Sequence, residues 1–191
     1  TIGGTTRKFA RSPASLAPAA AESIPVFENF VRVFQFGDAR YAREGQEYNV
    51  PGFFIADEDF FKIFTPDFIV GDPETALSSP NSLVISEDTA LQIFGKTDVL
   101  GEALSPPVPQ DTPQEGQRRI EFKVSGVIKN VPKNSHIRFN VLLSSISVRH
   151  NNHNNDPGIL EEPYFFFPSS YLLLKEGADP AAVKEKIMAV N

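Results

Sequence analysis

The chain has 191 residues, of which 41% are hydrophobic and 17 are Phe, and this composition excludes a disordered protein because so many aromatic rings need burial. Its net charge of -6 argues against non-specific binding to nucleic acid and against a basic membrane-surface patch. The absence of Cys excludes disulfides, thiolate metal sites and Cys nucleophiles, and no apolar run reaches the roughly 20 residues of a spanning helix.

Helices are predicted where apolar residues recur at helical spacing behind a capping residue. The expected apolar faces are Leu16, Ala20 and Ile24; Phe60, Phe61, Ile63 and Phe64; a helix over residues 87–94; and Val183, Ile187 and Val190. Ser12, Ser86 and Asp179 are the expected N-caps of three of these helices, and Gly95 stands where a left-handed C-terminal residue is favourable.

Strands are predicted where apolar residues alternate or form a short run between turn formers. They cover residues 30–36, 53–56, 68–70, 83–85 and 171–174. Residues 38–49 are polar and indicate an exposed hairpin, and Asp72 is expected to cap the turn that begins at Pro73.

The stretch from Glu121 to Ser144 organises the chain. It contains two alternating runs, joined by turn formers between Asn130 and Ser135, and we expect them to form an antiparallel pair that lies on the core. Gly126 interrupts the first run, which indicates a bulge or a close backbone approach. The stretch is a scaffold without visible catalytic chemistry.

Two groups of side chains invite a metal-site interpretation. Asp57, Glu58 and Asp59 are consecutive carboxylates, but no second ligand cluster follows at a defined spacing, and we favour their role at a helix N-terminus. His150, His153 and Asp156 have an H-x-x-H-x-x-D spacing, which Asn-rich segments also produce by chance.

Catalysis is not indicated either. Ser135 and His136 are adjacent on an extended segment and therefore point to opposite sides, so His136 is expected to hydrogen-bond the turn rather than to activate a nucleophile. We predict no catalytic residue, no cofactor site and no metal site, and a protein that is not an enzyme.

Several segments, in order, resemble the MacB-like periplasmic core domain of FtsX-like ABC transporter permeases, in the form found in Bacteroidetes. They are residues 24–32 (IPVFENFVR), 59–64 (DFFKIF), 71–77 (GDPETAL), 81–87 (NSLVISE), 122–128 (FKVSGVI), 132–137 (PKNSHI) and 171–180 (YLLLKEGADP). The chain departs from the family pattern in lacking a Trp-rich segment between Ser144 and Tyr171.

The resemblance implies an α+β fold with two subdomains. A porter-like mixed α/β layer is expected from residues 1–100 and 169–191, and an inserted, mainly β subdomain from residues 101–168. Our reading of the pattern agrees, since residues 101–168 show strands and long connections without a clear helix, and residues 101–117 are expected to form a long surface connection.

The resemblance also implies a function. The domain is expected on the periplasmic side of the cell inner membrane, between two transmembrane helices of a permease, where it transmits ATP-driven motion for export or mechanotransmission. The implied partners are a second permease copy, a cytoplasmic ATPase subunit that hydrolyses the ATP, and a periplasmic or outer-membrane protein, without nucleic acid. Both termini would then face one membrane, and the isolated domain would be monomeric or weakly associating.

Two other functions remain open. One is an extracytoplasmic module that senses a ligand or peptide or binds a partner, which a concave apolar pocket with converging polar groups would favour. The other is activation of a periplasmic cell-wall hydrolase, which an exposed apolar patch would favour. For a domain that transmits motion, substrate or partner contacts are expected at the exposed loops over residues 38–49, 101–117 and 149–157.

Overall fold

The computed structural model describes residues 11–106, 120–151 and 168–188, and its contacts divide the chain into two compact units. Unit 1 contains residues 1–34 and 158–191, and unit 2 contains residues 35–157. The predicted subdomains, residues 1–100 with 169–191 and residues 101–168, have other boundaries. Residues 35–100 group with the middle of the chain because their strands pair with β6 and β7.

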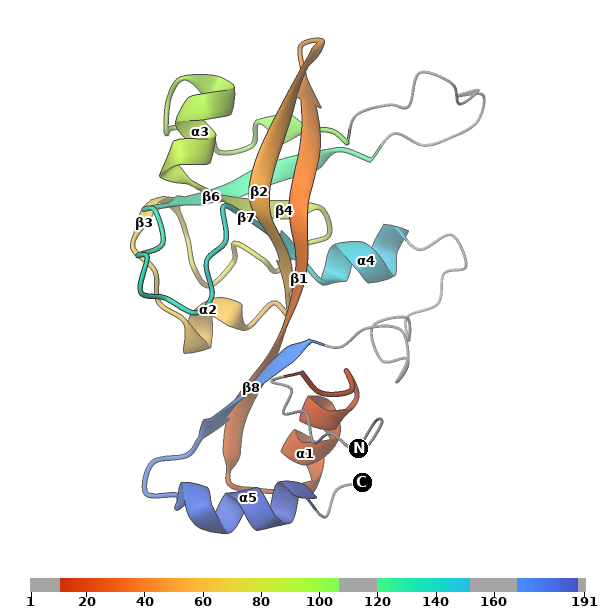
Figure 1. Ribbon diagram of the computed structural model, residues 1–191, viewed down its shortest axis with the longest axis vertical. Helices are drawn as coiled ribbons and strands as arrows, with labels where there is room; N and C mark the ends of the chain where they lie inside the picture. The colour runs from red at the N-terminus through yellow and green to blue at the C-terminus, as the bar shows by residue number, and fades with distance from the viewer. Residues whose placement is uncertain (1–10, 107–119, 152–167, 189–191) are drawn as a thin grey trace, which may run out of the picture. The chain divides into compact units, whose positions relative to one another are not determined.

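The described part of unit 1 contains two helices and two paired strands (Figure 1). They are α1 (Leu16–Ser23), the first part of β1 (Phe27–Arg43), β8 (Ser169–Leu174) and α5 (Pro180–Met188). The strands are antiparallel, with Phe27 opposite Leu174 and Val33 opposite Ser169. The core cluster of this unit contains Ala20, Ile24, Phe27 and Val183.

Unit 2 contains the rest of β1 and the remaining elements. These are β2 (Gln46–Ala56), α2 (Phe60–Ile63), β3 (Phe68–Gly71), β4 (Ser82–Ser86), α3 (Glu87–Phe94), β5 (Ala103–Leu104), β6 (Phe122–Ile128), β7 (Val141–Ser144) and α4 (Ile146–Asn151). Its strand order is β3-β6-β4-β7-β2-β1, with β5 on β6, and the described chain therefore has the α+β fold that was predicted.

The predicted pairing of the two strands between Glu121 and Ser144 is wrong. β4 lies between β6 and β7, parallel to β6 and antiparallel to β7. All five residues of β4 are buried, and a strand that is apolar on both faces is stable in the interior of a sheet. Residues 129–140 are therefore a long connection, which contributes the buried Ile137 and Phe139 to the core.

The expected irregularity at Gly126 is confirmed. The β4–β6 register shifts between Leu83 and Val84, opposite this glycine, and Gly126 also pairs with Gly71 of β3. A Cβ on Gly126 would lie 2.7 Å from the Phe68 ring, so the strands approach closely here.

The other predicted elements have mixed outcomes. The strands are all present; the β1–β2 hairpin is longer than residues 38–49 and contains the buried Tyr41. Ser86 caps α3, where its Oγ accepts the Thr89 amide at 3.3 Å, and Gly95 is left-handed with φ 71°. Asp179 caps α5 through the Ala181 amide at 2.9 Å.

Three local predictions are wrong. Ser12 does not cap α1, because Ser15 holds that position and Ser12 Oγ bonds Ser170 Oγ at 2.8 Å instead. The connection from Gly101 begins with β5, whose Leu104 is fully buried against β6. Residues 146–151 form the helix α4, although no helix was expected there. The rest of the predicted long connection, residues 107–117, lies outside the described residues.

Candidate functional site

A groove in unit 2 has a cavity volume of about 630 Å³. We call it the unit 2 groove. One wall is the segment from Phe60 to Asp67, and the other is the segment from Lys129 to Phe139. Its apolar lining consists of Phe60, Ile63, Phe64, Pro66, Val131, Pro132, Ile137 and Phe139, and its polar lining consists of Thr65, Asp67, Lys129, Asn130 and Ser135.

The aromatic floor of the groove is built by α2 and by the segment that leads into β7. The ring of Phe60 lies 4.9 Å from that of Phe64 and 5.7 Å from that of Phe139, between centroids. Phe60 and Phe139 are buried, whereas Phe64 is half-buried and stands edge-on to the His136 ring. Such edge contacts hold the rings in one arrangement, so the floor is preformed.

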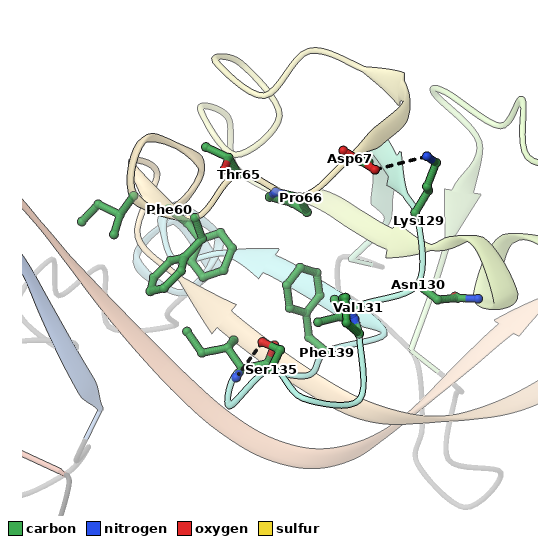
Figure 2. Close-up of a pocket in the computed structure, with 13 residues that line it drawn as sticks. Phe60, Thr65, Pro66, Asp67, Lys129, Asn130, Val131, Ser135 and Phe139 are labelled. Carbon is green, nitrogen blue, oxygen red and sulfur yellow. Dashed lines mark hydrogen bonds and ion pairs between the residues drawn. The ribbon is translucent and has the colours of Figure 1, made fainter.

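The pairing of β3 with β6 brings the polar end of the groove together. Asp67 precedes β3 and Lys129 follows β6, and the Lys129 amide donates to the Asp67 carbonyl at 2.8 Å. Their side chains form an ion pair of 3.1 Å. Figure 2 shows this pair at one end of the groove, Ser135 at the other, and the rings of Phe60 and Phe139 between them.

The second wall is held by its own polar side chains. Ser135 Oγ donates to the Ile137 carbonyl at 2.9 Å and accepts the Ile137 amide at 3.3 Å, which closes a local turn. Asn130 Oδ1 accepts the Asp88 amide at 3.1 Å and so ties the wall to the first turn of α3. These bonds fix the wall without involving a nucleophile or a base.

The carboxylates ahead of α2 have separate roles. Asp57 is buried and accepts a hydrogen bond from Ser145 Oγ at 3.1 Å. Asp59 holds the N-cap position without a side-chain cap bond and forms a 2.8 Å ion pair with Lys62, so the predicted capping bond is absent. The hydrogen bond to Asp59 and its charge raise the pKa of the exposed Lys62.

The other residues considered from the sequence are dispersed. His150 lies in the last turn of α4, and His153 and Asp156 lie outside the described residues. Within the described ranges no group of three or more His, Cys, Asp or Glu is placed to hold a metal ion. The Ser135 side chain bonds to the backbone of Ile137, and the His136 ring stands edge-on to the Phe64 ring.

A smaller apolar hollow of about 270 Å³ lies in unit 1, between α5 and the β1–β8 pair. Phe27, Leu172, Leu174, Val183 and Ile187 line it, next to the core cluster. Of the described helices, none combines the length and the apolar character that a membrane crossing requires.

The sequence did not identify the unit 2 groove. Phe60 and Phe64 were assigned to the core side of a helix, and Ile137 and Phe139 to the core face of a strand. Pro66, Val131 and Pro132 were the available signal, because apolar residues that gather in one exposed patch can mark a ligand-binding groove. The arrangement can bind a ligand with an apolar portion.

Comparison with solved structures finds this fold in 24 chains, among them the following three. A domain of a putative permease protein from Porphyromonas gingivalis has 24% identity and a TM-score of 0.73, over 98% of this chain and 74% of that chain. The periplasmic region of MacB from Actinobacillus actinomycetemcomitans has 11% identity and a TM-score of 0.61, over 100% and 78%. The extracellular domain of the noncanonic ABC-type transporter YknZ from Gram-positive bacteria has 11% identity and a TM-score of 0.55, over 96% and 80%.

A comparison with curated protein sequences finds no match. The family model of the MacB-like periplasmic core domain, in contrast, matches residues 1–190, which is nearly the whole chain. This is a family of permease domains that lie outside the membrane. The chain therefore belongs to the MacB-like periplasmic core domain family.

Proposed function

We propose that this domain transmits ATP-driven motion in an ABC transporter permease, on the periplasmic side of the inner membrane. A cytoplasmic ATPase subunit supplies the energy, and the domain moves against the same domain of a second permease copy. Transmembrane helices that precede and follow the domain carry the motion to it. The motion of the domain then drives export or mechanotransmission. The observation that carries the proposal is the family match over residues 1–190.

The structure of unit 1 supports this proposal. The first and last described helices, α1 and α5, share one core cluster through Ala20 and Val183. The Ser12 amide also donates to the Pro168 carbonyl at 3.1 Å, so the two arms of the chain are bonded within this unit. Two chain segments that pack in one core cluster are displaced together, because close-packed interiors transmit strain. Thr1 and Asn191 themselves lie outside the described residues, so the placement of both termini toward one membrane stays a prediction.

Spin labels on the full-length permease test the proposal. The chain has no Cys, so Leu91→Cys, at a side chain that is 47% exposed on α3, gives one label in each copy of the domain. We expect the distance between the labels of two copies, measured by pulsed electron resonance in membranes with the ATPase subunit, to change when ATP is added. A pair of labels within unit 2, at Leu91→Cys and Glu47→Cys, is the control and should keep its distance.

The same distance with and without ATP, in a complex that hydrolyses ATP, would exclude transmission through this domain. If no distance between labels is detected, each complex holds a single label. That result would contradict the presence of a second permease copy in the complex. The periplasmic or outer-membrane partner is a further part of the proposal, and co-purification with the intact permease tests it.

The unit 2 groove favours a second candidate function, a module that binds a ligand or a partner protein. Its volume of about 630 Å³ falls within the roughly 300–1,000 Å³ of small-molecule sites, and its lining combines aromatic rings with a few polar groups. This function does not exclude transmission, since a permease domain can both move and bind.

A further inference from the structure

The apolar hollow between α5 and the β1–β8 pair, which we call the unit 1 hollow, has a single cation in its lining. Among the described residues that line it, Lys184 of α5 has the only polar side chain, and the other six are apolar. Phe27 and Val183 are buried core residues, whereas Leu172 and Ile187 are half-buried. Apolar surface next to one cation therefore faces the hollow.

The charge of Lys184 is not neutralised within the described part of the chain. Its side chain is exposed and forms no ion pair with any residue that the structure describes. The residues three and four positions away on α5 are Pro180, Ala181, Ile187 and Met188. None of them is acidic, so no carboxylate is placed to pair with Lys184 along the helix. An anionic group at the hollow would meet an unpaired cation, in a chain whose net charge is -6.

The lining favours an aliphatic chain over a peptide. Phe27 and Leu174, which both line the hollow, are opposite each other in the β1–β8 pair, so the backbone of these strands is used in the sheet. The ammonium group of Lys184 donates hydrogen bonds and accepts none. A peptide in the hollow would therefore bury its amide N–H groups without acceptors, which is unfavourable. An acyl chain has no such groups to satisfy.

The size of the hollow matches one acyl chain. A group as large as a water molecule occupies roughly 30 Å³, so a volume of about 270 Å³ holds about nine groups of this size. A methylene group is of similar size, and its burial is favourable. The hollow therefore accommodates eight or nine carbon atoms of one chain, with the polar end of the ligand outside.

We propose that the unit 1 hollow binds an acyl chain of an anionic membrane lipid, with the lipid head group beside Lys184. The acyl chain supplies most of the affinity, so the site needs no basic surface patch. The choice of membrane lipid as the source of the chain rests on the proposed function, in which a transmembrane helix follows α5. The binding chemistry itself rests on the lining of the hollow.

Photo-cross-linking in membranes that contain the full-length permease tests the proposal. The probe is phosphatidylglycerol with a diazirine in one acyl chain, and the matched probe is phosphatidylcholine with the same chain. Proteolysis and mass spectrometry locate the adducts. We expect adducts on β8 and α5, within residues 169–188. Phosphatidylglycerol should give about two- to fivefold more of them, because an exposed ion pair contributes only modestly.

Variants of the permease locate the binding. Lys184→Gln should lower the adducts of phosphatidylglycerol to the level of phosphatidylcholine, whereas Lys133→Gln, at an exposed site in unit 2, should leave the ratio unchanged. Ile187→Trp places a bulky ring in the hollow and should lower the adducts of both lipids about fivefold or more. Leu91→Trp, at an exposed site on α3, should lower neither. Urea unfolding of each variant checks that it is folded, and Lys184→Gln keeps the test decisive if Ile187→Trp does not fold.

Three results would overturn the proposal: no adduct within residues 169–188, equal yields from the two lipids, or unchanged yields in folded Ile187→Trp. Adducts confined to the transmembrane helices belong to the first result and would mean that another part of the permease covers the hollow. Cross-linking requires no ATP, so its failure leaves the distance between labels untested and a constant distance leaves the adducts in place. The two proposals therefore fail separately.

Discussion

Gly71→Ala is the sharpest test of the packing in unit 2. Gly71 ends β3 with φ 99° and pairs with Gly126 of β6. A Cβ at this position would lie 2.7 Å from the Ser125 carbonyl oxygen and 2.8 Å from Gly126 Cα. Both atoms belong to the backbone of β6, so β3 has to move away from its partner strand to admit a methyl group.

The expected cost has two parts. A residue other than Gly at positive φ costs about 1–2 kcal/mol, because its Cβ meets the carbonyl oxygen. Overpacking against fixed atoms adds about 1–3 kcal/mol. We therefore expect Gly71→Ala to lower the free energy of unfolding by about 2–5 kcal/mol, which is a large part of the roughly 5–15 kcal/mol of a typical domain.

Gly95→Ala is the matched control, since Gly95 has φ 71° and no atom within 4 Å of the added Cβ. Only the backbone cost remains there, about 1–2 kcal/mol. Gly126→Ala should fall between the two, because the nearest atom is a Phe68 ring carbon at 2.7 Å and a half-buried ring can turn aside.

Urea unfolding followed by circular dichroism measures these differences, with the slope against urea as a check that the transition stays two-state. Equal losses of stability in Gly71→Ala and Gly95→Ala, within about 0.5 kcal/mol, would refute the reasoning. Such a result would mean that β3 is not held against β6 as closely as the pairing indicates.

Three further predictions concern stability. Ser86→Ala removes the cap of α3 and should cost about 1–2 kcal/mol, whereas Ser15→Ala, at an N-cap position without a side-chain bond, should cost less than about 0.5 kcal/mol in the same urea assay. Ser145→Ala removes a donor from the buried Asp57 and should cost about 1–3 kcal/mol; an unchanged urea midpoint would show that the bond is dispensable. Burial raises the pKa of Tyr41, so this side chain contributes stability below its unfolded value of about 10 that is lost as pH rises above it. Tyr41→Phe should therefore lose less stability than the parent chain between pH 8 and pH 11, and parallel losses would contradict the assignment.

Local signals in the sequence determined most of the elements. Ser86 and Gly95 delimit α3 because a cap and a left-handed residue act within one turn. Asp72 was likewise confirmed in its turn, where its carboxylate accepts the Glu74 amide at 3.0 Å. Ser12 failed as a cap because a partner distant in the sequence, Ser170, takes its hydroxyl.

Strand order was not accessible from these signals. The alternating runs around β6 and β7 suggested direct pairing, since neighbours in sequence usually pair. The competing signal was the fully apolar run of β4, which favours a central position between two strands. The strand order depends on the burial of both faces of β4. That burial is a property of the whole sheet and not of any one segment. The unit 2 groove follows from that order, so the sequence did not reveal it.

The two proposed functions depend on different parts of the chain. The arms that would receive motion pack in unit 1 around Ala20 and Val183, whereas the groove lies entirely among residues of unit 2. Val131→Trp should therefore leave the ATP-dependent change in the distance between labels intact, because it changes no contact of the unit 1 cluster. Loss of that distance change in the folded variant would mean that occupation of the groove controls the motion, and the two functions would then be one.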